Sequence, residues 1–250
     1  MPHNSIIKIE NLSKSFGLNK VLDKINLEVN KGDSIAIIGQ SGTGKSVLIK
    51  NIIGVMKPDF GKIYIEGEEI TKLTQNQRIK KSYGIGLLFQ GSALFDSLTI
   101  KENVVFGLAI HKKISSVEAH RIALENLELV GLDASVLNLY PAELSGGMQK
   151  RVALARLIVL KSKILFFDEP TSGLDPVMSN IIGDVILDVV KYLGATAITI
   201  THEMKIATKL AHKIIMLDSG KIAWQGHPQD IYNPNNKLIY NFTHGLTYTN

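Results

Sequence analysis

The clearest chemical pattern in the chain lies at residues 39–46, which read Gly39-Gln40-Ser41-Gly42-Thr43-Gly44-Lys45-Ser46. An apolar run at 34–38 precedes them and a helical pattern at 47–53 follows, as in the phosphate-binding pattern G-x-x-x-x-G-K-[ST]. Glycines let backbone N–H groups approach phosphate oxygens, and a helix N-terminus carries positive partial charge. Lys45 would reach the β- and γ-phosphates, and the Ser46 hydroxyl would bind Mg²⁺. These residues predict a nucleotide-binding site.

Two adjacent carboxylates, Asp168 and Glu169, follow a run of four large apolar residues at 164–167. Neighbouring side chains on a strand point to opposite faces, so the two acids would have different roles. Asp168 would hold Mg²⁺ through water, and Glu169 would face the attacking water. The alternative, an acidic strand end in solvent, fits poorly after such an apolar run.

Three further side chains stand where predicted elements end or begin. Gln90 ends the apolar strand at 84–89, and its amide would reach a metal or a water. His202 stands at the tip of a strand at 195–201, and we expect it to sense the γ-phosphate rather than to be an ordinary surface or core histidine. Phe16 would stack on an adenine ring, although the residues alone leave an ordinary core aromatic equally open.

A second candidate anion site opens the helix that follows residue 145. Ser145 would cap that helix, and Gly146 and Gly147 leave its first N–H groups bare, at the positive end of the dipole. One phosphate loop already serves one nucleotide, so a second anion site calls for a partner. Asp175 and Pro176 start a later helix, which ends at Gly194.

The elements that position these residues alternate between strands and helices, so we predict an α/β fold. Residues 5–38 read as short strands, and 213–217 and 221–225 read as a hairpin. Residues 91–163 look helical, with a capping box at Ser115 and Glu118 that opens a helix ending at Val130. Because strands resume at 164, this region reads as an inserted subdomain. A short helical tail, broken at Asn233-Pro234, ends the chain.

Composition excludes several classes of protein. The chain has 250 residues, a formal net charge of +5 and no cysteine, which excludes disulfides and thiolate metal sites. Its apolar runs are far shorter than the about 18–20 residues that cross a bilayer, and its start lacks a leader pattern. We therefore expect a cytoplasmic protein. The lysines are scattered, so a solvated surface is favoured over a nucleic-acid patch.

In this order, the phosphate loop, Gln90, Leu144-Ser145-Gly146-Gly147, Asp168-Glu169, Ser172-Gly173-Leu174-Asp175 and His202 resemble the ATP-binding subunits of ABC transporters over essentially the whole chain. The resemblance implies a P-loop NTPase fold with a mixed β core. Residues 1–90 and 164–227 would form that core with an N-terminal β subdomain, 91–163 the helical subdomain and 228–250 the tail.

The resemblance also implies a function. Two chains would form a head-to-tail homodimer that traps two ATP molecules, each phosphate loop facing the Ser145-Gly146-Gly147 helix of the other subunit. Phe16 matches the adenine-stacking position, and Asp175 would lie at the dimer interface. ATP hydrolysis would drive membrane permease subunits from the cytoplasmic side of the inner membrane, without nucleic acid.

One position departs from the family's commonest pattern: Met148 stands where most members have Gln. This Met, the segment 89–99 and the tail at 242–245 resemble the subgroup that serves Mce/Mla-type lipid transport in bacterial envelopes. That subgroup implies phospholipid as substrate and periplasmic or membrane-anchored lipid-binding subunits as further partners. Leu94, Phe95 and Leu98 would line a groove for a partner helix, unless they simply fill the helical subdomain.

Three alternatives stay open. The same motor would fit an importer of polar solutes such as amino acids. A non-transport ABC protein acting on ribosomes or DNA is less favoured, because those on ribosomes usually carry two cassettes and those on DNA a long coiled coil. A small-molecule kinase would share the phosphate loop but would have no use for Ser145-Gly146-Gly147.

Overall fold

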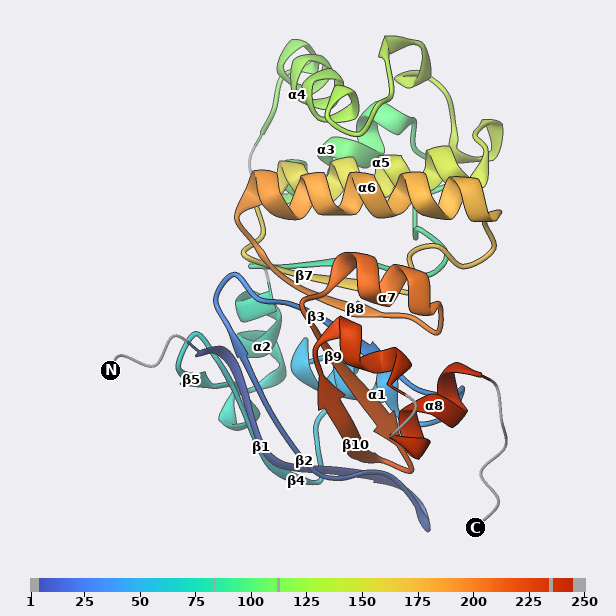
Figure 1. Cartoon of the computed structure of the whole chain (residues 1–250). Helices are drawn as coiled ribbons and strands as arrows, with labels where there is room; N and C mark the ends of the chain where they lie inside the picture. Colours follow the sequence, from blue (N-terminus) through green and yellow to red (C-terminus); the bar gives the residue numbers. More distant parts are fainter. Residues whose placement is uncertain (1–4, 83, 112, 234–235, 245–250) are drawn as a thin grey trace. The chain divides into compact units, whose positions relative to one another are not determined.

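The computed structural model describes residues 5–82, 84–111, 113–233 and 236–244 (Figure 1). These residues divide into two compact units, which are described separately. One unit holds the described parts of Met1–Tyr83 and Thr196–Asn250, and the other holds those of Gly84–Ala195. Both units combine strands with helices, so the predicted α/β class is confirmed. The expected split at residues 91 and 163 into core and helical subdomain stays a prediction.

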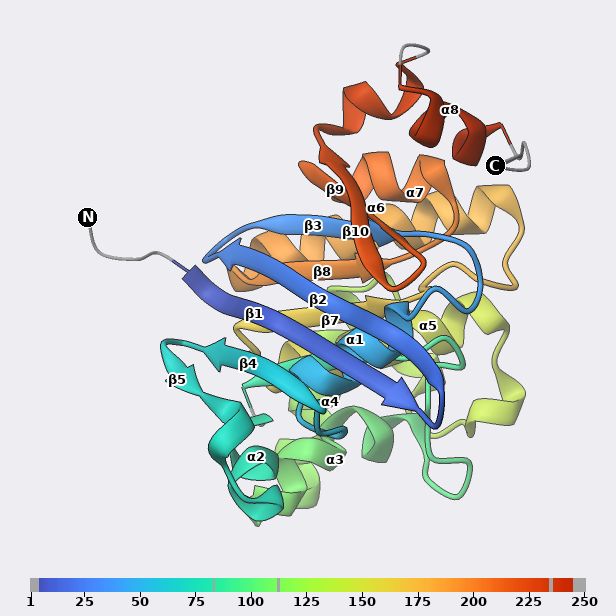
Figure 2. The same ribbon diagram turned by 90° about the horizontal axis from the view of Figure 1, so that it is seen from below.

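The first unit contains an antiparallel sheet in the order β2-β1-β4-β5. Its strands are β1 Ser5–Phe16, β2 Asn19–Asn30, β4 Phe60–Ile65 and β5 Glu68–Glu69, and Figure 2 shows β2, β1 and β4 side by side. The prediction of short strands here is wrong, because β1 and β2 have 12 residues each. Register shifts between Ile9 and Leu12 and between Leu12 and Lys14 break the apolar alternation, which made long strands read as short ones.

Four more strands of this unit lie in the order β10-β9-β3-β8. They are β3 Ser34–Ile38, β8 Thr196–Ile200, β9 Lys213–Asp218 and β10 Lys221–Gly226. β3 pairs in parallel with both β8 and β9, whereas β9 and β10 form the predicted antiparallel hairpin. Parallel strands are buried on both faces, and all five residues of β8 are buried accordingly.

Helices of the first unit cover these strands. They are α1 Lys45–Ile52, α2 Gln75–Ser82, α7 Met204–Leu210 and α8 Lys237–Thr243, with 3₁₀ turns at Ile70–Lys72 and Pro228–Tyr232. The tail joins the core, because Ile231 and Ile239 are fully buried in one cluster with Ile38 and Met216. Pro234 and Gly245, which belong to the predicted tail break and the subgroup resemblance, lie outside the described residues.

The second unit pairs β6 Ile85–Leu88 in parallel with β7 Ile164–Asp168. Its helices are α3 Ile100–His111, α4 Ser116–Glu128, α5 Gly146–Val159 and α6 Pro176–Leu193, with 3₁₀ turns at Ala134–Val136 and Pro141–Glu143. α5 is the central helix, since it contacts α3, α4 and α6, and Figure 1 shows it among them. None of the helices in the described part of the chain is both long enough and apolar enough to cross a bilayer.

Side-chain caps fix the helix starts that the sequence predicts. Ser115 Oγ accepts from Glu118 N at 3.1 Å, and Ser145 Oγ accepts from Met148 N at 3.3 Å. Asp175 Oδ1 accepts from two N–H groups of α6, at 2.9 and 3.0 Å. α4 ends at Glu128, two residues before the predicted Val130, because the chain closes there in a turn that leads to the left-handed Gly131.

Replacing Ser115 by Ala should destabilise the protein by about 1 kcal/mol, because the N–H of Glu118 loses its acceptor. Denaturant unfolding followed by circular dichroism measures this as a lower midpoint at unchanged slope. Ser116→Ala is the matched control, since Ser116 is the exposed first residue of α4. An equal loss in both variants would show that the cap is not the cause.

Candidate functional site

The phosphate loop joins β3 to α1, and its glycines hold conformations that other residues rarely adopt. Gly39, Gly42 and Gly44 have φ of 150°, 83° and 101°. A Cβ at Gly39 would lie 2.3 Å from the carbonyl oxygen of Leu217, and one at Gly44 would lie 2.8 Å from that of Val21. The loop therefore requires glycine for its backbone angles and for its close packing on β9 and β2.

Lys45 folds back over this loop. Its Nζ donates to Gly39 O at 2.6 Å and to Gln40 O at 2.8 Å, which places the ammonium over the loop's own main chain. Thr43 Oγ1 also donates to Gln40 O, at 2.9 Å. Ser46, the second residue of α1, is exposed, and the N-cap residue of this helix is a glycine without a capping side chain. The start of α1 thus offers N–H groups, a hydroxyl and a cation, a donor set that suits a polyphosphate.

His202 lies at the edge of the sheet from which this loop starts. Ile37 of β3 pairs with Ile200 of β8, and Thr201 N donates to Ile37 O at 3.4 Å. Because the strands are parallel, His202 follows β8 at the same edge where Gly39 follows β3. Its side chain is exposed. The first unit therefore brings together the loop and the predicted sensor of the γ-phosphate.

Phe16 stands at the end of β1, where the chain turns into β2. Its side chain is 48% exposed, so it is not the core aromatic that the residues alone left open. Phe16 pairs with Asn19, and Val21, two residues further and about 7 Å along the strand, packs against Gly44. The exposed ring therefore stands at the end of the strand pair whose β2 packs against the loop, which suits an adenine whose phosphates lie on the loop.

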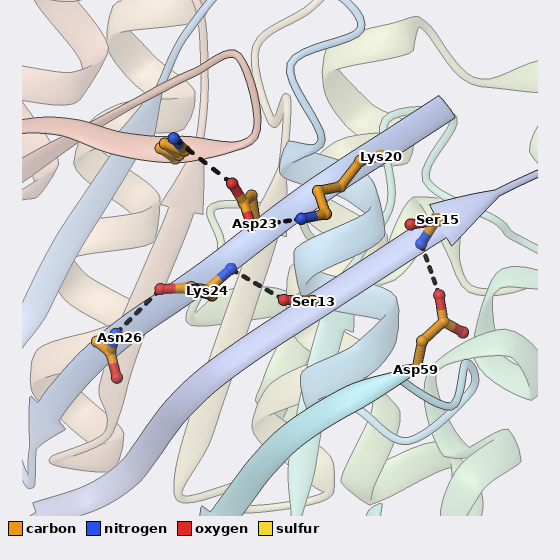
Figure 3. A network of polar contacts seen from close by, with 8 residues as sticks. Ser13, Ser15, Lys20, Asp23, Lys24, Asn26 and Asp59 are labelled. Atoms are coloured by element: carbon orange, nitrogen blue, oxygen red, sulfur yellow. Dashed lines mark hydrogen bonds and ion pairs between the residues drawn. The ribbon is translucent and has the colours of Figure 1, made fainter. Parts of the chain in front are cut away.

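A carboxylate fixes the strand end that carries Phe16 (Figure 3). Asp59 accepts from Ser15 N at 2.7 Å and from Lys14 Nζ at 2.7 Å. Lys14 Nζ lies 5.6 Å from the centre of the Phe16 ring. The hydrogen bond from Lys14, followed by that from the Ser15 N–H, lowers the pKa of the Asp59 carboxyl. Asp59 therefore stays ionised at neutral pH and holds this end of β1.

Polar contacts also hold β2, the strand that pairs with β1. Asp23 lies between the ammonium groups of Lys20, at 2.8 Å, and Lys221, at 3.5 Å. Figure 3 shows its contact with Lys20. Lys24 N donates to the hydroxyl of the buried Ser13, at 3.0 Å. These contacts tie β2 to β1 and to the start of β10, so the strand against which the phosphate loop packs is braced on both sides.

The second unit gathers another set of predicted residues at one edge of its strand pair. Leu88 of β6 pairs with Phe167 of β7, so Gln90 and Glu169 each follow two residues beyond this pair, at the same edge. Asp168 is the last residue of β7. Gln90 Nε2 donates to Ser172 Oγ at 3.0 Å. An amide and two carboxylates at one strand edge suit a metal-bound phosphate and a water.

Glu169 has a left-handed backbone, with φ of 47°. This conformation costs a residue with a Cβ roughly 1–2 kcal/mol. Such strain is typical of functional positions and requires support from the surroundings. Here Ser172 N donates to Glu169 O at 3.1 Å, so the turn after β7 is closed directly behind the carboxylate.

The start of α5 packs closely on the start of α6. A Cβ at Gly147 would lie 2.7 Å from Met178 Sδ, and one at Gly146 would lie 3.6 Å from a methyl group of Leu174. Ser145 and Gly146 are exposed. The predicted second anion site therefore lies beside the Asp175 turn, where Gly147 itself is buried.

Two cationic residues of α5 were missed by the sequence analysis. Lys150, only 4% exposed, donates through Nζ to the carbonyl oxygen of Gln90. Burial lowers the pKa of the Lys150 ammonium, and the negative charge of Asp168 opposes this shift. Arg156 donates to Ser92 O and Ala93 O, at 2.9 Å each, and burial lowers its pKa too. The only sequence signal is a basic residue at helix positions surrounded by apolar ones.

The predicted site residues thus form two sets, one in each unit. The first unit holds Phe16, the loop 39–46 and His202, and the second holds Gln90, Ser145 with its two glycines, Asp168, Glu169 and Asp175. Within each set, strand pairing or close packing brings the residues to one edge or one helix start. Together the two sets contain a loop suited to phosphates and carboxylates suited to a metal ion and to a base, which are the kinds of group that ATP hydrolysis uses.

Comparison with known proteins gives the same assignment. The family model described as "ABC transporter" matches residues 22–172. A methionine import ATP-binding protein of Lactobacillus johnsonii is 38% identical over 96% of this chain and 70% of its own length. "Trigalactosyldiacylglycerol 3, chloroplastic" of Arabidopsis thaliana is 36% identical, over 96% and 74% respectively.

A solved structure has the same fold. The dimeric post-hydrolysis state of the ATP-binding cassette MJ0796, bound to ADP and Pi, superimposes with a TM-score of 0.81 at 30% identity, over 89% of this chain and 98% of that one. The predicted ABC ATPase fold is confirmed by this likeness. The chain belongs to the ABC transporter family, as an ATP-binding subunit that hydrolyses ATP.

Proposed function

We propose that this chain is the ATPase of a lipid transporter, most like the Mla/Mce-type systems that move phospholipid across the bacterial envelope. It acts as a homodimer that closes on ATP, and it works from the cytoplasmic side of the inner membrane. Membrane permease subunits convert its closure into movement of the lipid, together with periplasmic or membrane-anchored lipid-binding subunits. Nucleic acid has no part in this function.

The observation that carries the lipid assignment is the likeness of segment 89–99 and Met148 to that subgroup. A relative named for a galactolipid, at 36% identity, supports it. Phe89 and Phe95 of this segment are 47% and 42% exposed, as a docking surface for a membrane subunit requires. Import proteins for methionine and cystine are 38% and 37% identical, so an importer of amino acids is the second candidate.

The nucleotide is bound chiefly by the first unit's residues. Phe16 stacks on the adenine, while the N–H groups of Gly39 to Ser46 and the ammonium of Lys45 bind the phosphates. The Gly44 start of α1, which has no capping side chain, fits this role. Ser46, Gln90 and Asp168 would hold Mg²⁺, directly or through water, because a hydroxyl, an amide and a carboxylate offer the oxygen ligands that this ion prefers. When bound, Mg²⁺ neutralises charge that develops on the phosphates.

Hydrolysis requires a base and a donor at the γ-phosphate. Glu169 orients the attacking water and accepts its proton, because Asp168 is committed to the metal. His202 donates to a γ-phosphate oxygen. The turn closed by the Ser172 N–H fixes the backbone that carries this carboxylate, and such positioning lowers the entropy lost when water and phosphate align.

The second subunit completes each site. The start of its α5, with Ser145, Gly146 and Gly147, donates N–H groups to the γ-phosphate, and Asp175 lies at the interface. A relative whose structure is a dimer with ADP and Pi supports this arrangement. Binding across the interface explains why one chain carries two anion sites.

Glu169→Gln should reduce ATP turnover by roughly 10²–10⁴, because it keeps the shape of the side chain and removes the base. ATP should still bind, and the closed dimer should accumulate with ATP and Mg²⁺, as size-exclusion chromatography would show. Asp168→Asn is the control, since it should instead weaken Mg²⁺-dependent binding. Turnover at the parent rate in Glu169→Gln would refute its role and make His202 the next candidate.

Phe95→Glu should release the membrane subunits, since loss of a central aromatic anchor costs roughly 30-fold in affinity. Affinity purification from membranes measures the amount retained, and the isolated variant should still bind ATP. Val117→Glu, on an 81% exposed residue of α4, is the matched control. Retained membrane subunits together with a less stable fold would show that Phe95, whose ring lies 4.3 Å from that of Phe106, serves only packing.

The substrate assignment is tested on the complex purified with its membrane subunits. Mass spectrometry of the bound molecules should find phospholipid, and the co-purified proteins should include a lipid-binding subunit. Phospholipid vesicles should stimulate its ATPase activity. A co-purified solute-binding protein, with stimulation by an amino acid and not by lipid, would establish the second candidate.

A further inference from the structure

The turn after Gln90 is held by two cationic side chains of one helix, the buried Lys150 and the half-buried Arg156. Lys150 of α5 donates to the Gln90 carbonyl, and Arg156, six residues later on the same helix, donates to those of Ser92 and Ala93. Three of the four carbonyl groups of residues 90–93, all but that of Gly91, therefore accept hydrogen bonds from α5. This turn comes directly after β6, which pairs with β7. The contacts from α5 therefore fix the path of the chain where it leaves β6.

The next part of the same segment is held by one fully buried amide. Asn103 of α3 accepts from Phe95 N at 2.8 Å and donates to Phe95 O, Leu98 O and Thr99 O at 3.0–3.1 Å. Its side chain is 0% exposed. Points along the main chain from Gln90 to Thr99 are thus fixed by two buried side chains and one half-buried side chain, while Phe89 and Phe95 stay 47% and 42% exposed.

A role beyond stability follows from the cost of this arrangement. Lysine and arginine are almost never fully buried unless they are paired, and a buried charge requires strong compensation. Lys150 is such a buried charge and Arg156 is half-buried, and both donate to main-chain carbonyls. Ser92 and Ala93, which supply the carbonyls for Arg156, have left-handed φ of 61° and 49°. An ordinary apolar contact would pack this helix at lower cost, so the cations serve the position of the turn.

The same helix carries the anion site at its first residues. α5 is continuous from Gly146 to Val159, so Ser145 and Arg156 are joined by a rigid rod about 16 Å long. Lys150 lies between these two residues, and its ammonium donates to the Gln90 carbonyl oxygen. A displacement of the helix start would therefore move the Gln90 turn with it.

We propose that Lys150 and Arg156 are positioning residues, which set Gln90 for the metal and water and link its turn to the Ser145 end of α5. The inference rests on the proposed role of Gln90. It implies that α5 connects Ser145, which would contact the nucleotide held by the other subunit, with segment 89–99, which would contact the membrane subunit. Neither residue touches the nucleotide or the metal itself.

The test compares Lys150→Met, Arg156→Met and Gln90→Ala with the double variant Lys150→Met/Gln90→Ala. We expect each single variant to raise the Mg²⁺ concentration for half-maximal hydrolysis, or to lower kcat, by about 10–100-fold, as loss of a supporting contact to a metal site does. The affinity for ATP without Mg²⁺ should stay at the parent value. The double variant should be no worse than Gln90→Ala alone, because Lys150 acts through Gln90.

Arg156→Lys keeps the charge but cannot bridge two carbonyls as a guanidinium does, so it should give an intermediate loss of kcat at parent thermal stability. Arg156→Lys still tests the proposal if the Met variants do not fold. Parent kcat and Mg²⁺ dependence in Lys150→Met and Arg156→Lys, or additive losses in the double variant, would overturn the inference while the proposed function stands. A fully active Gln90→Ala would overturn the role of Gln90 and this inference with it.

Discussion

Parallel pairing of short buried strands is the constraint on which the candidate site depends. Ile37 beside Ile200 and Leu88 beside Phe167 fix two registers, and in each unit the functional residues follow directly after the paired strands. A slip of one residue would turn every side chain to the opposite face. The complete burial of Ile37, Phe166 and Phe167 makes such a slip costly, so apolar packing determines where the polar groups emerge.

Support for the emerging residues differs between the two units. In the first, Asp59 and Asp23 bind lysines near the surface, where ion pairs contribute little to stability and salt weakens them. Several such ion pairs, together with the close contact of Gly44 with β2, hold the strands that position Phe16. In the second, Lys150 and Asn103 act from the interior, where each hydrogen bond is electrostatically stronger, and the half-buried Arg156 adds two further hydrogen bonds. The turn that carries the left-handed Ser92 and Ala93 needs this stronger hold.

The sequence predicts those features that depend on neighbours in the chain. The glycine loop, the caps at Ser115, Ser145 and Asp175, and the hairpin at 213–225 all follow from local chemistry and all occur in the structure. The length of β1 could not be predicted, because bulges interrupt its alternation. The contacts of Lys150 and Arg156 could not be predicted either, because main-chain carbonyls 60 or more residues away carry no side-chain pattern.

The departure at Met148 has a simple physical meaning. Its backbone N–H, and not its side chain, completes the cap with Ser145 Oγ, so a methionine in place of glutamine leaves the start of α5 unchanged. The same separation holds for the docking segment, where Asn103 binds only the main chain of Phe95. Exposed side chains on such a backbone can change without moving the predicted site residues that it supports. Under the proposed function, the surface side chains at 89–98 would therefore determine the choice of partner, independently of the residues proposed for hydrolysis.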